Sequence, residues 1–508
     1  MSVTSTELIY RLTDYAIQKN LIDAEDRAYT VNRLLELMQL DAPEEIDYTP
    51  EAAPETATRY LDALADIAAS WKLIGDSGER RDLFTARVMG LLTPHPAQVR
   101  ARFNALYRES PARATEWFYQ LCRDVDYIRV DRIAKNARFF ADSPAGKLEI
   151  TINLSKPEKD PRDIAAARNA VQANYPRCML CVENPGYAGR IGFPARQNHR
   201  VLPLTLGGKA WYMQYSPYLY YNEHCIVLNG EHVPMRISHD TFVRLFDFVR
   251  QFPHYFLGSN ADLPIVGGSI LTHDHFQGGN YRFPMDDAGV RVALTAPDAR
   301  VEACVADWPM SCVRLESESE EALIALADRL LEAWRAWSDP ENGILAETDQ
   351  PHNTVTPILR RVNDKYRLDL VLRNNRTDAA HPLGIFHPHD DLHHIKKENI
   401  GLIEVMGLFI LPGRLLSELS GLEDMLTGKA PLAEPDADSP LLKHYAWIAD
   451  IAARRGTGMT ADQAKAALRE ELAVKCARVL ADAGVYKNTP AGNAGIVRFL
   501  ESIGYSAL

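Results

Sequence analysis

The sequence predicts an α+β protein in which two similar α+β units lie between helical N- and C-terminal regions. Apolar residues recur at helical spacing from residue 5 to about residue 130, and again after about residue 415. Between these regions, several segments alternate apolar and polar residues with the period of two that is typical of strands. The predicted regions are 1–135, 136–300, 301–415 and 416–508.

The first region is predicted to be helical and to carry no chemistry. Its amphipathic pattern begins with Leu8, Leu12, Ile17 and Leu21 and continues over residues 31–38. The acidic, proline-containing stretch 41–54 interrupts the pattern, so a loop or linker is expected there.

The first α+β unit is expected to contain strands at 147–154, 199–204 and 225–228. Apolar residues from Phe242 to Val249 then mark a helix that ends before Pro253. A turn at Gly267 and Gly268 follows this helix and leads into the histidine segment, which ends at Gly279.

The second α+β unit repeats the order of strand, helix and strand. A strand is expected at 312–315, a helix over 323–337 that stops at Pro340, and a further strand at 366–373. The repeated order suggests a duplication. The C-terminal region is expected to be helical, with a long helix over 461–483.

Composition excludes several functional classes. The 508 residues are 46% apolar and 24% charged, which is ordinary for a globular protein, and the net charge of −12 argues against a broad nucleic-acid-binding or membrane-binding surface. The N-terminus lacks the pattern of a signal peptide. The strongest apolar run, 402–411, contains Glu404 and is shorter than the roughly 20 residues that span a bilayer. A cytoplasmic location is therefore expected.

Seven cysteines, an odd number, do not form a disulfide framework. Cys178 and Cys181 form a CxxC pair that could supply half of a zinc site, with histidines as the remaining ligands. A redox pair and two core cysteines are the alternatives. The isolated cysteines are expected to be small buried apolar residues: Cys122, Cys225, Cys304, Cys312 and Cys476.

His273, Asp274 and His275 are the second candidate feature. In an extended segment residues i and i+2 face the same side, so both imidazoles enter one site and Asp274 points away. A paired metal site and two surface histidines are the alternatives to a catalytic role. The flanking glycines at 267–268 and 278–279 allow close approach of the backbone to a bulky anion, which favours a phosphate site.

The segment 387–399 is the richest in histidine. His387, His389, Asp391 and His393 nearly match the HxHxDH ligands of metallo-β-lactamase-like hydrolases. The match is not exact, because one extra residue stands between Asp391 and His393. A dinuclear metallohydrolase is therefore the rival hypothesis, and a polar loop before a helix is the simpler alternative.

The combination of these motifs resembles the galactose-1-phosphate uridylyltransferases of the longer bacterial class, a branch of the histidine-triad superfamily. The resemblance covers roughly residues 110–415. It rests on the CxxC pair and on the amino-acid sequences of four segments, 222–227, 267–279, 352–357 and 393–407. It implies duplicated histidine-triad-like units and a homodimer. It also implies ping-pong transfer of UMP from UDP-glucose to galactose 1-phosphate, or to a related hexose 1-phosphate, in galactose metabolism.

The resemblance further implies the roles of individual residues. His275 would be the nucleophile that forms a uridylyl-histidine intermediate, and this requires a neutral imidazole whose other nitrogen is held by a hydrogen-bond acceptor. Gln277, two residues on, would donate to a phosphate oxygen. A glutamine is a poor proton donor to a leaving group, which suits transfer to a phosphate acceptor.

The metal site and substrate contacts are likewise implied by the resemblance. A structural zinc ion would be held by Cys178, Cys181, His232 and His273, with His224 as a spare candidate, and no organic cofactor is expected. A second, iron-binding histidine pair of some relatives corresponds to Asp369 and Val371, so no iron is expected. The predicted substrate-binding residues are Asn198, Asn260, Gly267, Ser269, Lys156, Lys159 and Lys397.

Two features keep alternatives open. Leu402 and Ile403 replace polar or aromatic residues of the family's hexose-binding stretch, so an N-acetylhexosamine 1-phosphate is an alternative acceptor. A noncatalytic nucleotide-binding protein would keep the glycine-rich segment without needing His275.

Overall fold

A computed structural model describes residues 3–155, 174–268 and 270–508. The chain divides into two compact units, Met1–Lys135 with Ser155–Val233 and Asn136–Leu154 with Pro234–Leu508. Three of the predicted substrate-binding residues, Lys156, Lys159 and Ser269, lie outside the described residues.

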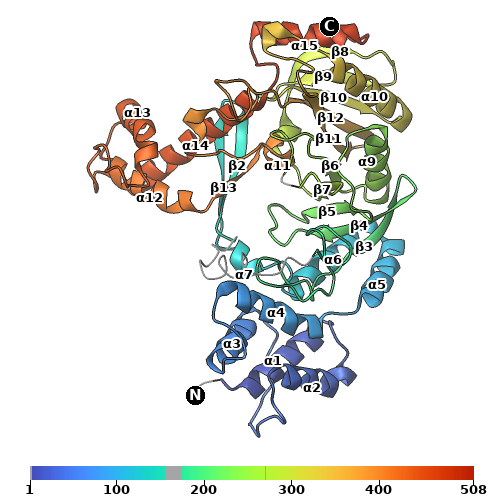
Figure 1. The fold of residues 1–508 in the computed structure, drawn as a ribbon, viewed down its shortest axis with the longest axis vertical. Coiled ribbons are helices and arrows are strands. Elements are labelled where there is room, and N and C mark those ends of the chain that lie inside the picture. The colour runs from blue at the N-terminus through green and yellow to red at the C-terminus, as the bar shows by residue number, and fades with distance from the viewer. Residues whose placement is uncertain (1–2, 156–173, 269) are drawn as a thin grey trace. The chain divides into compact units, whose positions relative to one another are not determined.

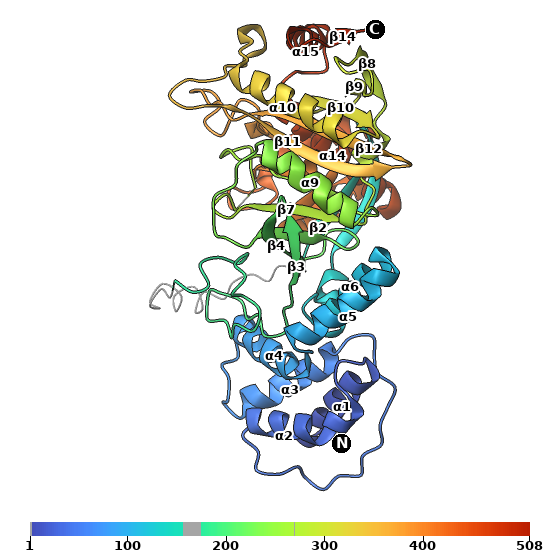
Figure 2. The ribbon, with the colours of Figure 1, turned by 90° about the vertical axis from the view of Figure 1, so that its right-hand side faces the viewer.

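Helices make up most of the first unit (Figures 1 and 2). Side chains that precede them accept hydrogen bonds from first-turn N–H groups: Thr4 for α1, Ser77 for α4 and Ser110 for α6. The predicted loop at 41–54 contains no helix or strand. The helices are α1 (Ser5–Gln18), η1 (Ala24–Asp26), α2 (Arg27–Leu37), α3 (Thr58–Ser70), α4 (Gly78–Leu92), α5 (Pro96–Glu109), α6 (Pro111–Asp124) and α7 (Val130–Ile133).

The described part of the first unit also contains three antiparallel strands: β3 (Leu202–Leu206), β4 (Lys209–Tyr215) and β5 (Cys225–Asn229). The prediction for β5 is correct. β3 begins three residues later than predicted, because the guanidinium of Arg200 donates to four backbone carbonyls, among them those of Thr93 and Pro94, and this holds the preceding residues in a loop.

The second unit contains eight successive strands of an antiparallel sheet, in the order β14-β8-β9-β10-β12-β11-β6-β7. The strands are β6 (Phe256–Gly258), β7 (His275–Gly279), β8 (Val290–Thr295), β9 (Glu302–Ala306), β10 (Cys312–Ser317), β11 (Asn353–Val362), β12 (Lys365–Asn374) and β14 (Ser506–Ala507). The strands predicted at 312–315 and 366–373 are thus β10 and β12.

Helices α9 (His239–Gln251) and α10 (Glu320–Ala336) lie side by side on one face of these strands (Figure 2). Trp334 of α10 is fully buried, and its indole N–H donates to the carbonyls of Thr354 and Arg373 at 3.0 and 3.2 Å. This fixes α10 on β11 and β12. Both helices match the sequence prediction.

A second, three-stranded sheet consists of β1 (Ala137–Ser143), β2 (Gly146–Asn153) and β13 (Leu408–Pro412). β1 and β2 are antiparallel, whereas β13 lies parallel to β2. The apolar run 402–411 supplies the short helix α11 (Leu402–Val405) and most of β13. Among the described residues, no helix is long and apolar enough to cross a membrane.

The C-terminal region is helical, with α12 (Arg414–Thr427), α13 (Tyr445–Arg455), α14 (Ala461–Ala483) and α15 (Pro490–Ser502). α14 has the bounds predicted from sequence, because Thr460 and Gln463 form a reciprocal capping box at its start and Gly484 follows its end. Short 3₁₀ helices are η2 (Pro284–Asp287), η3 (Pro340–Asn342), η4 (Asp390–Leu392) and η5 (Leu442–His444). The predicted α+β class is confirmed, while the predicted region boundaries stay predictions.

Leu370 of β12, which is fully buried, provides a test of this core. We expect Leu370→Ala to lower the free energy of unfolding by about 2–5 kcal/mol, because the substitution leaves a cavity in the sheet. Urea unfolding measures the change. Leu416→Ala on α12, where the side chain is 44% exposed, is the matched control and should change it by less than about 0.5 kcal/mol. Equal losses in the two variants would contradict the placement of β12 in the core.

Candidate active site and metal centre

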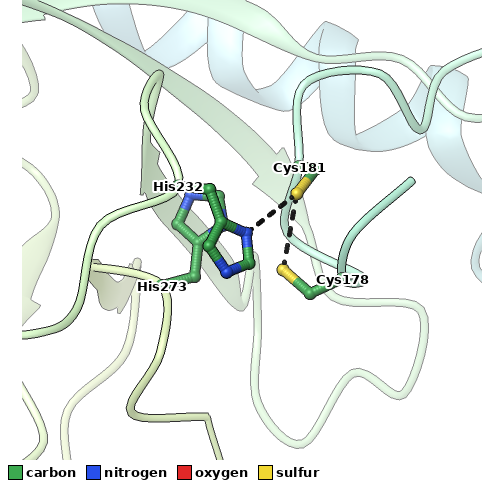
Figure 3. A group of neighbouring side chains, drawn as sticks. All are labelled: Cys178, Cys181, His232 and His273. Atoms are coloured by element: carbon green, nitrogen blue, oxygen red, sulfur yellow. Dashed lines mark hydrogen bonds between the residues drawn. The ribbon is translucent and has the colours of Figure 1, made fainter. Parts of the chain in front are cut away.

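Two cysteines and two histidines converge in the structure (Figure 3). The possible ligand atoms of Cys178, Cys181, His232 and His273 all lie within 4.8 Å of one another. The two sulfur atoms are 3.6 Å apart, and Cys181 Sγ lies 3.2 Å from His232 Nδ1. This cluster could hold a metal ion.

The donor set and its spacing fit a tetrahedral ion. Thiolates and imidazoles are the usual ligands of structural zinc, with Zn–S about 2.3 Å and Zn–N about 2.0 Å, which places neighbouring ligand atoms roughly 3.4–3.8 Å apart. The two separations given above are close to that range, and the other ligand atoms are at most 4.8 Å apart. Cys181 and His273 are buried, and Cys178 and His232 are half-buried. His224, the spare candidate, is not in the cluster and packs instead against the ring of Tyr221, 4.4 Å away.

Asn184 shapes the loop that carries the two cysteines. Its buried side-chain amide donates to the carbonyls of Cys178 and Cys181 at 2.9 and 2.7 Å, and the N–H of Leu180 points at Cys178 Sγ. These bonds hold the turn so that both sulfur atoms face one point. Sequence reasoning missed this role, for which Asn184-Pro-Gly after the CxxC pair was the available signal.

His275 is the first residue of β7 and is 6% exposed. Its Nδ1 lies 2.8 Å from the backbone carbonyl oxygen of His273. A carbonyl only accepts, so Nδ1 carries the proton and donates, and Nε2 keeps its lone pair. Burial lowers the pKa of His275 to about 4, which favours the neutral ring. The imidazole is therefore held in the tautomer that a nucleophile requires.

Asp274 faces away from the two imidazoles, as the alternation of an extended segment predicts. Its carboxylate lies 3.5 Å from the guanidinium of Arg244 on α9, and both side chains are buried. Arg244 also pairs with Asp240 at 3.0 Å. The ion pair between Asp274 and Arg244 therefore connects the histidine segment to α9.

Comparison with known proteins identifies the family of this chain. The family model described as "Galactose-1-phosphate uridyl transferase, N-terminal domain" matches residues 20–234, and the model of the corresponding C-terminal domain matches residues 248–429. Galactose-1-phosphate uridylyltransferases of Caldanaerobacter subterraneus and Bacillus subtilis are each 47% identical to the chain, over 98% of both sequences in each comparison.

The chain belongs to the galactose-1-phosphate uridylyltransferase family. Its predicted membership is thereby confirmed, as is its predicted galactose-1-phosphate uridylyltransferase activity in galactose metabolism. Yeast Ap4A phosphorylase Apa2 is a solved structure that resembles it distantly, at 14% identity and a TM-score of 0.30 over 63% of this chain and 98% of that one.

Gly267 and Asn260, two of the residues that the uridylyltransferase resemblance assigns to substrate, lie in one loop. Gly267 forms an isolated bridge with Ala261, and a Cβ there would lie 2.6 Å from the Ala261 carbonyl oxygen and 2.7 Å from that of Leu263. The Oδ1 of Asn260 accepts from the N–H of Leu402 at 2.8 Å. Asn260 thus connects the glycine-rich loop to the start of α11.

Asn198 and Lys397 belong to other segments of the chain. The buried amide of Asn198 donates to the Val125 carbonyl at 2.9 Å, inside the first unit. Lys397 of the second unit is exposed. Its neighbour Lys396 is buried and pairs with Glu404 at 2.9 Å, so this lysine is used in the fold and not left for a phosphate.

The histidine-rich segment does not form the rival dinuclear site. Ring nitrogens of His387 and His393 face the carbonyl of Pro388, and His389 Nε2 faces that of Ile385. Asp391 forms an ion pair with Arg478 at 2.8 Å. Within the described ranges, the Cys–His cluster is the one group found in which three or more ligand atoms converge. The metallohydrolase hypothesis therefore has no supporting geometry.

Asp369, at the apparent place of an iron ligand in some relatives, also has a structural role. Its carboxylate pairs with the Arg314 guanidinium through two hydrogen bonds, of 2.7 and 3.1 Å, between β12 and β10.

Four of the five isolated cysteines are buried as predicted, and Cys304 is half-buried.

The close packing at Gly267 gives a testable prediction. We expect Gly267→Ala to lower the free energy of unfolding by about 1–3 kcal/mol, because its Cβ meets two backbone carbonyls that cannot rotate away. Gly289→Ala is the control, since a Cβ there meets nothing within 4 Å. Thermal unfolding of both variants compares them. If Gly267→Ala is as stable as Gly289→Ala, the described close contact between Gly267 and the carbonyls of Ala261 and Leu263 is wrong.

Proposed function

We propose that this chain transfers UMP from UDP-glucose to galactose 1-phosphate, or to a related hexose 1-phosphate, by a ping-pong reaction through a uridylyl-His275 intermediate. Family membership supports the overall reaction. The observation that supports the role of His275 is the hydrogen bond from its Nδ1–H to the His273 carbonyl, which leaves Nε2 with its lone pair.

In the first half-reaction, Nε2 of His275 attacks the α-phosphorus of UDP-glucose. The N–P bond forms as the bond between the α-phosphorus and the bridging oxygen breaks, and glucose 1-phosphate leaves with that oxygen. In the second half-reaction, a phosphate oxygen of the acceptor attacks the same phosphorus and the imidazole leaves. Each step conserves charge and requires no proton transfer.

The His273 carbonyl stabilises the intermediate more than the free ring. An imidazole whose Nε2 is bonded to phosphorus carries a positive charge that it shares with Nδ1–H. The hydrogen bond of 2.8 Å to the carbonyl is therefore stronger in the intermediate than in the resting enzyme, and this difference lowers the barrier.

Gln277 is proposed to hold a non-bridging phosphate oxygen. It lies two residues after His275 on β7 and is half-buried. Alternate residues of a strand face the same side, so its amide can reach the same phosphate. The amide cannot supply a proton, but glucose 1-phosphate does not need one to leave, because it departs as a stable phosphate anion.

Replacement of His275 tests the covalent mechanism. We expect His275→Ala to lose exchange of labelled glucose 1-phosphate into UDP-glucose, measured without a second sugar phosphate, by more than about a thousandfold. His239→Ala is the control, since this histidine is exposed at the start of α9. Exchange that persisted in His275→Ala would overturn the covalent mechanism, and the absence of exchange in the unchanged enzyme would favour a noncatalytic nucleotide-binding protein.

We propose that Cys178, Cys181, His232 and His273 hold a structural zinc ion. The donor types and the ligand separations described above support it, and four protein ligands leave no open position for a substrate. Bound zinc would fix the orientation of His273, and hence of the carbonyl that orients His275.

Metal analysis tests this site. We expect about one zinc per chain, lost in Cys178→Ser and Cys181→Ser but retained in Cys304→Ser, which changes an isolated half-buried cysteine. Mass spectrometry of the purified proteins after dialysis gives the metal content. Two metals per chain that disappear in His387→Ala and His389→Ala would support the dinuclear hydrolase instead.

The remaining substrate contacts are proposals of the same kind. Asn198, Asn260, Gly267 and Ser269 are proposed to face uridine and phosphate, Lys156 and Lys159 the phosphates, and Lys397 the hexose. The second amide atom of Asn260, Nδ2, has no hydrogen-bond partner among the described residues and is free to donate to a ligand. Rates with a panel of hexose and N-acetylhexosamine 1-phosphates would identify the acceptor.

We further propose that the enzyme is a cytoplasmic homodimer that acts on small molecules, not on nucleic acid or membrane lipid. The net charge of −12 supports the choice of substrate class. Sedimentation analysis at several protein concentrations would identify the oligomeric state.

A further inference from the structure

A cavity of about 750 Å³ lies in the second unit, where η4 and the residues after it meet α13 and α14. Pockets that bind small ligands usually measure roughly 300–1,000 Å³. His394, Trp447, Lys475 and Arg478 are among its lining residues. None of these residues takes part in the proposed uridylyl transfer.

A chain of three buried or half-buried groups ends at this cavity. The carboxylate of Glu418, which is 4% exposed, lies 2.9 Å from Nε2 of His444, which is fully buried. Nδ1 of His444 lies 2.7 Å from Nδ1 of His394. Arg414 and Lys443 also pair with Glu418, at 2.6 and 2.5 Å, and these cations keep the carboxylate ionised.

This chain fixes the protonation of both imidazoles. The Glu418 carboxylate only accepts, so His444 Nε2 carries a proton and donates it. Burial lowers the pKa of His444, so its ring is neutral and its Nδ1 is an acceptor. His394 must then donate from Nδ1, and its Nε2 keeps a lone pair. Burial also lowers the pKa of His394 to about 3, so this nitrogen stays an acceptor.

Two donors at the cavity are also unused. Lys475 of α14 forms no ion pair within the part of the chain that the structure describes, and it is close enough to His394 to lower the pKa of that ring. The indole N–H of Trp447 donates to no described residue either. An acceptor, a cation and a neutral donor are thus present together in one cavity.

Each of the other cations at the cavity has a carboxylate partner. Arg478 pairs with Asp391 and Arg454 with Glu471, each at 2.8 Å; Arg454 also pairs with Asp450, and Lys443 pairs with Glu418. Lys475 is the lining cation without an ion pair among the described residues, and the nearby carboxylates of Asp391, Asp450 and Glu471 act on it only from a distance.

We propose that this cavity is a second ligand site, separate from the uridylyl-transfer site, for a polyhydroxylated phosphate ester such as a sugar phosphate. The phosphate pairs with Lys475, a hydroxyl group donates to Nε2 of His394, and the Trp447 N–H donates to an oxygen of the ligand. Phosphate alone lacks the hydroxyl donor for His394, and an uncharged sugar lacks the partner for Lys475.

Titration calorimetry with glucose 6-phosphate tests the site. This probe carries its phosphate away from the anomeric carbon, unlike the hexose 1-phosphates of the proposed reaction. We expect saturable binding in the unchanged enzyme and the same affinity in His275→Ala. We expect binding at least about tenfold weaker for inorganic phosphate and for glucose, since each lacks one of the two main contacts.

Two substitutions examine the contacts separately. Lys475→Gln removes the cation, and His394→Asn keeps an N–H close to the place of Nδ1 while it removes the acceptor Nε2. We expect each to weaken glucose 6-phosphate binding by about tenfold or more. Lys465→Gln, an exposed lysine on the same helix, is the matched control and should bind as the unchanged enzyme does. Circular dichroism and thermal unfolding of every variant confirm that it is folded.

Several outcomes would overturn the proposal. These are no binding of glucose 6-phosphate at millimolar concentration, unchanged affinity in Lys475→Gln and His394→Asn, or competition by UDP-glucose together with loss in His275→Ala. The last outcome would place the probe in the catalytic site. Failure of uridylyl exchange would leave this test unaffected, because the two sites share none of these residues.

Discussion

The hydrogen bond from His275 Nδ1 to the carbonyl of His273 is the interaction on which the proposed chemistry depends. It joins two residues of one short segment, yet it fixes the ring, the tautomer and the free nitrogen together. A buried imidazole without such an acceptor would exchange between tautomers and expose its lone pair only part of the time. Much of the surrounding structure holds the His273 carbonyl and the His275 ring in this geometry.

His273 has two functions at once. Its side chain belongs to the Cys–His cluster, and its carbonyl belongs to the hydrogen bond that orients His275. Between the two histidines, Asp274 is held from the opposite side by Arg244. A segment fixed at its side chain, its carbonyl and its middle residue has little freedom to move, which is the preorganisation that a nucleophile needs.

Histidines have different uses in the two sites of the second unit. At His275 the acceptor is a backbone carbonyl, and burial is the main cause of the lowered pKa that keeps the ring neutral. At His394 the acceptor is another imidazole, which in turn donates to a carboxylate. Both arrangements leave one unprotonated nitrogen. Their neighbours differ: Gln277 suits a transferred phosphoryl group, whereas Lys475 suits a bound phosphate.

The sequence by itself determined the α+β class, the family, several of the helices and five of the strands. Periodicity and capping residues act over a few positions, which is why α14 could be predicted to the residue and β10 and β12 nearly so. The four residues that converge in the cluster were also predicted from sequence to lie together, through the family's motif. Tertiary structure decided the rest, because it depends on contacts between distant positions: the parallel pairing of β13 with β2, the role of Asn184, and the pairing of Asp391 with Arg478 that removes it from a metal site. Residues 387–394 are rich in possible ligands, but which atoms they face is set by packing against α12 to α14, and no local pattern records that packing.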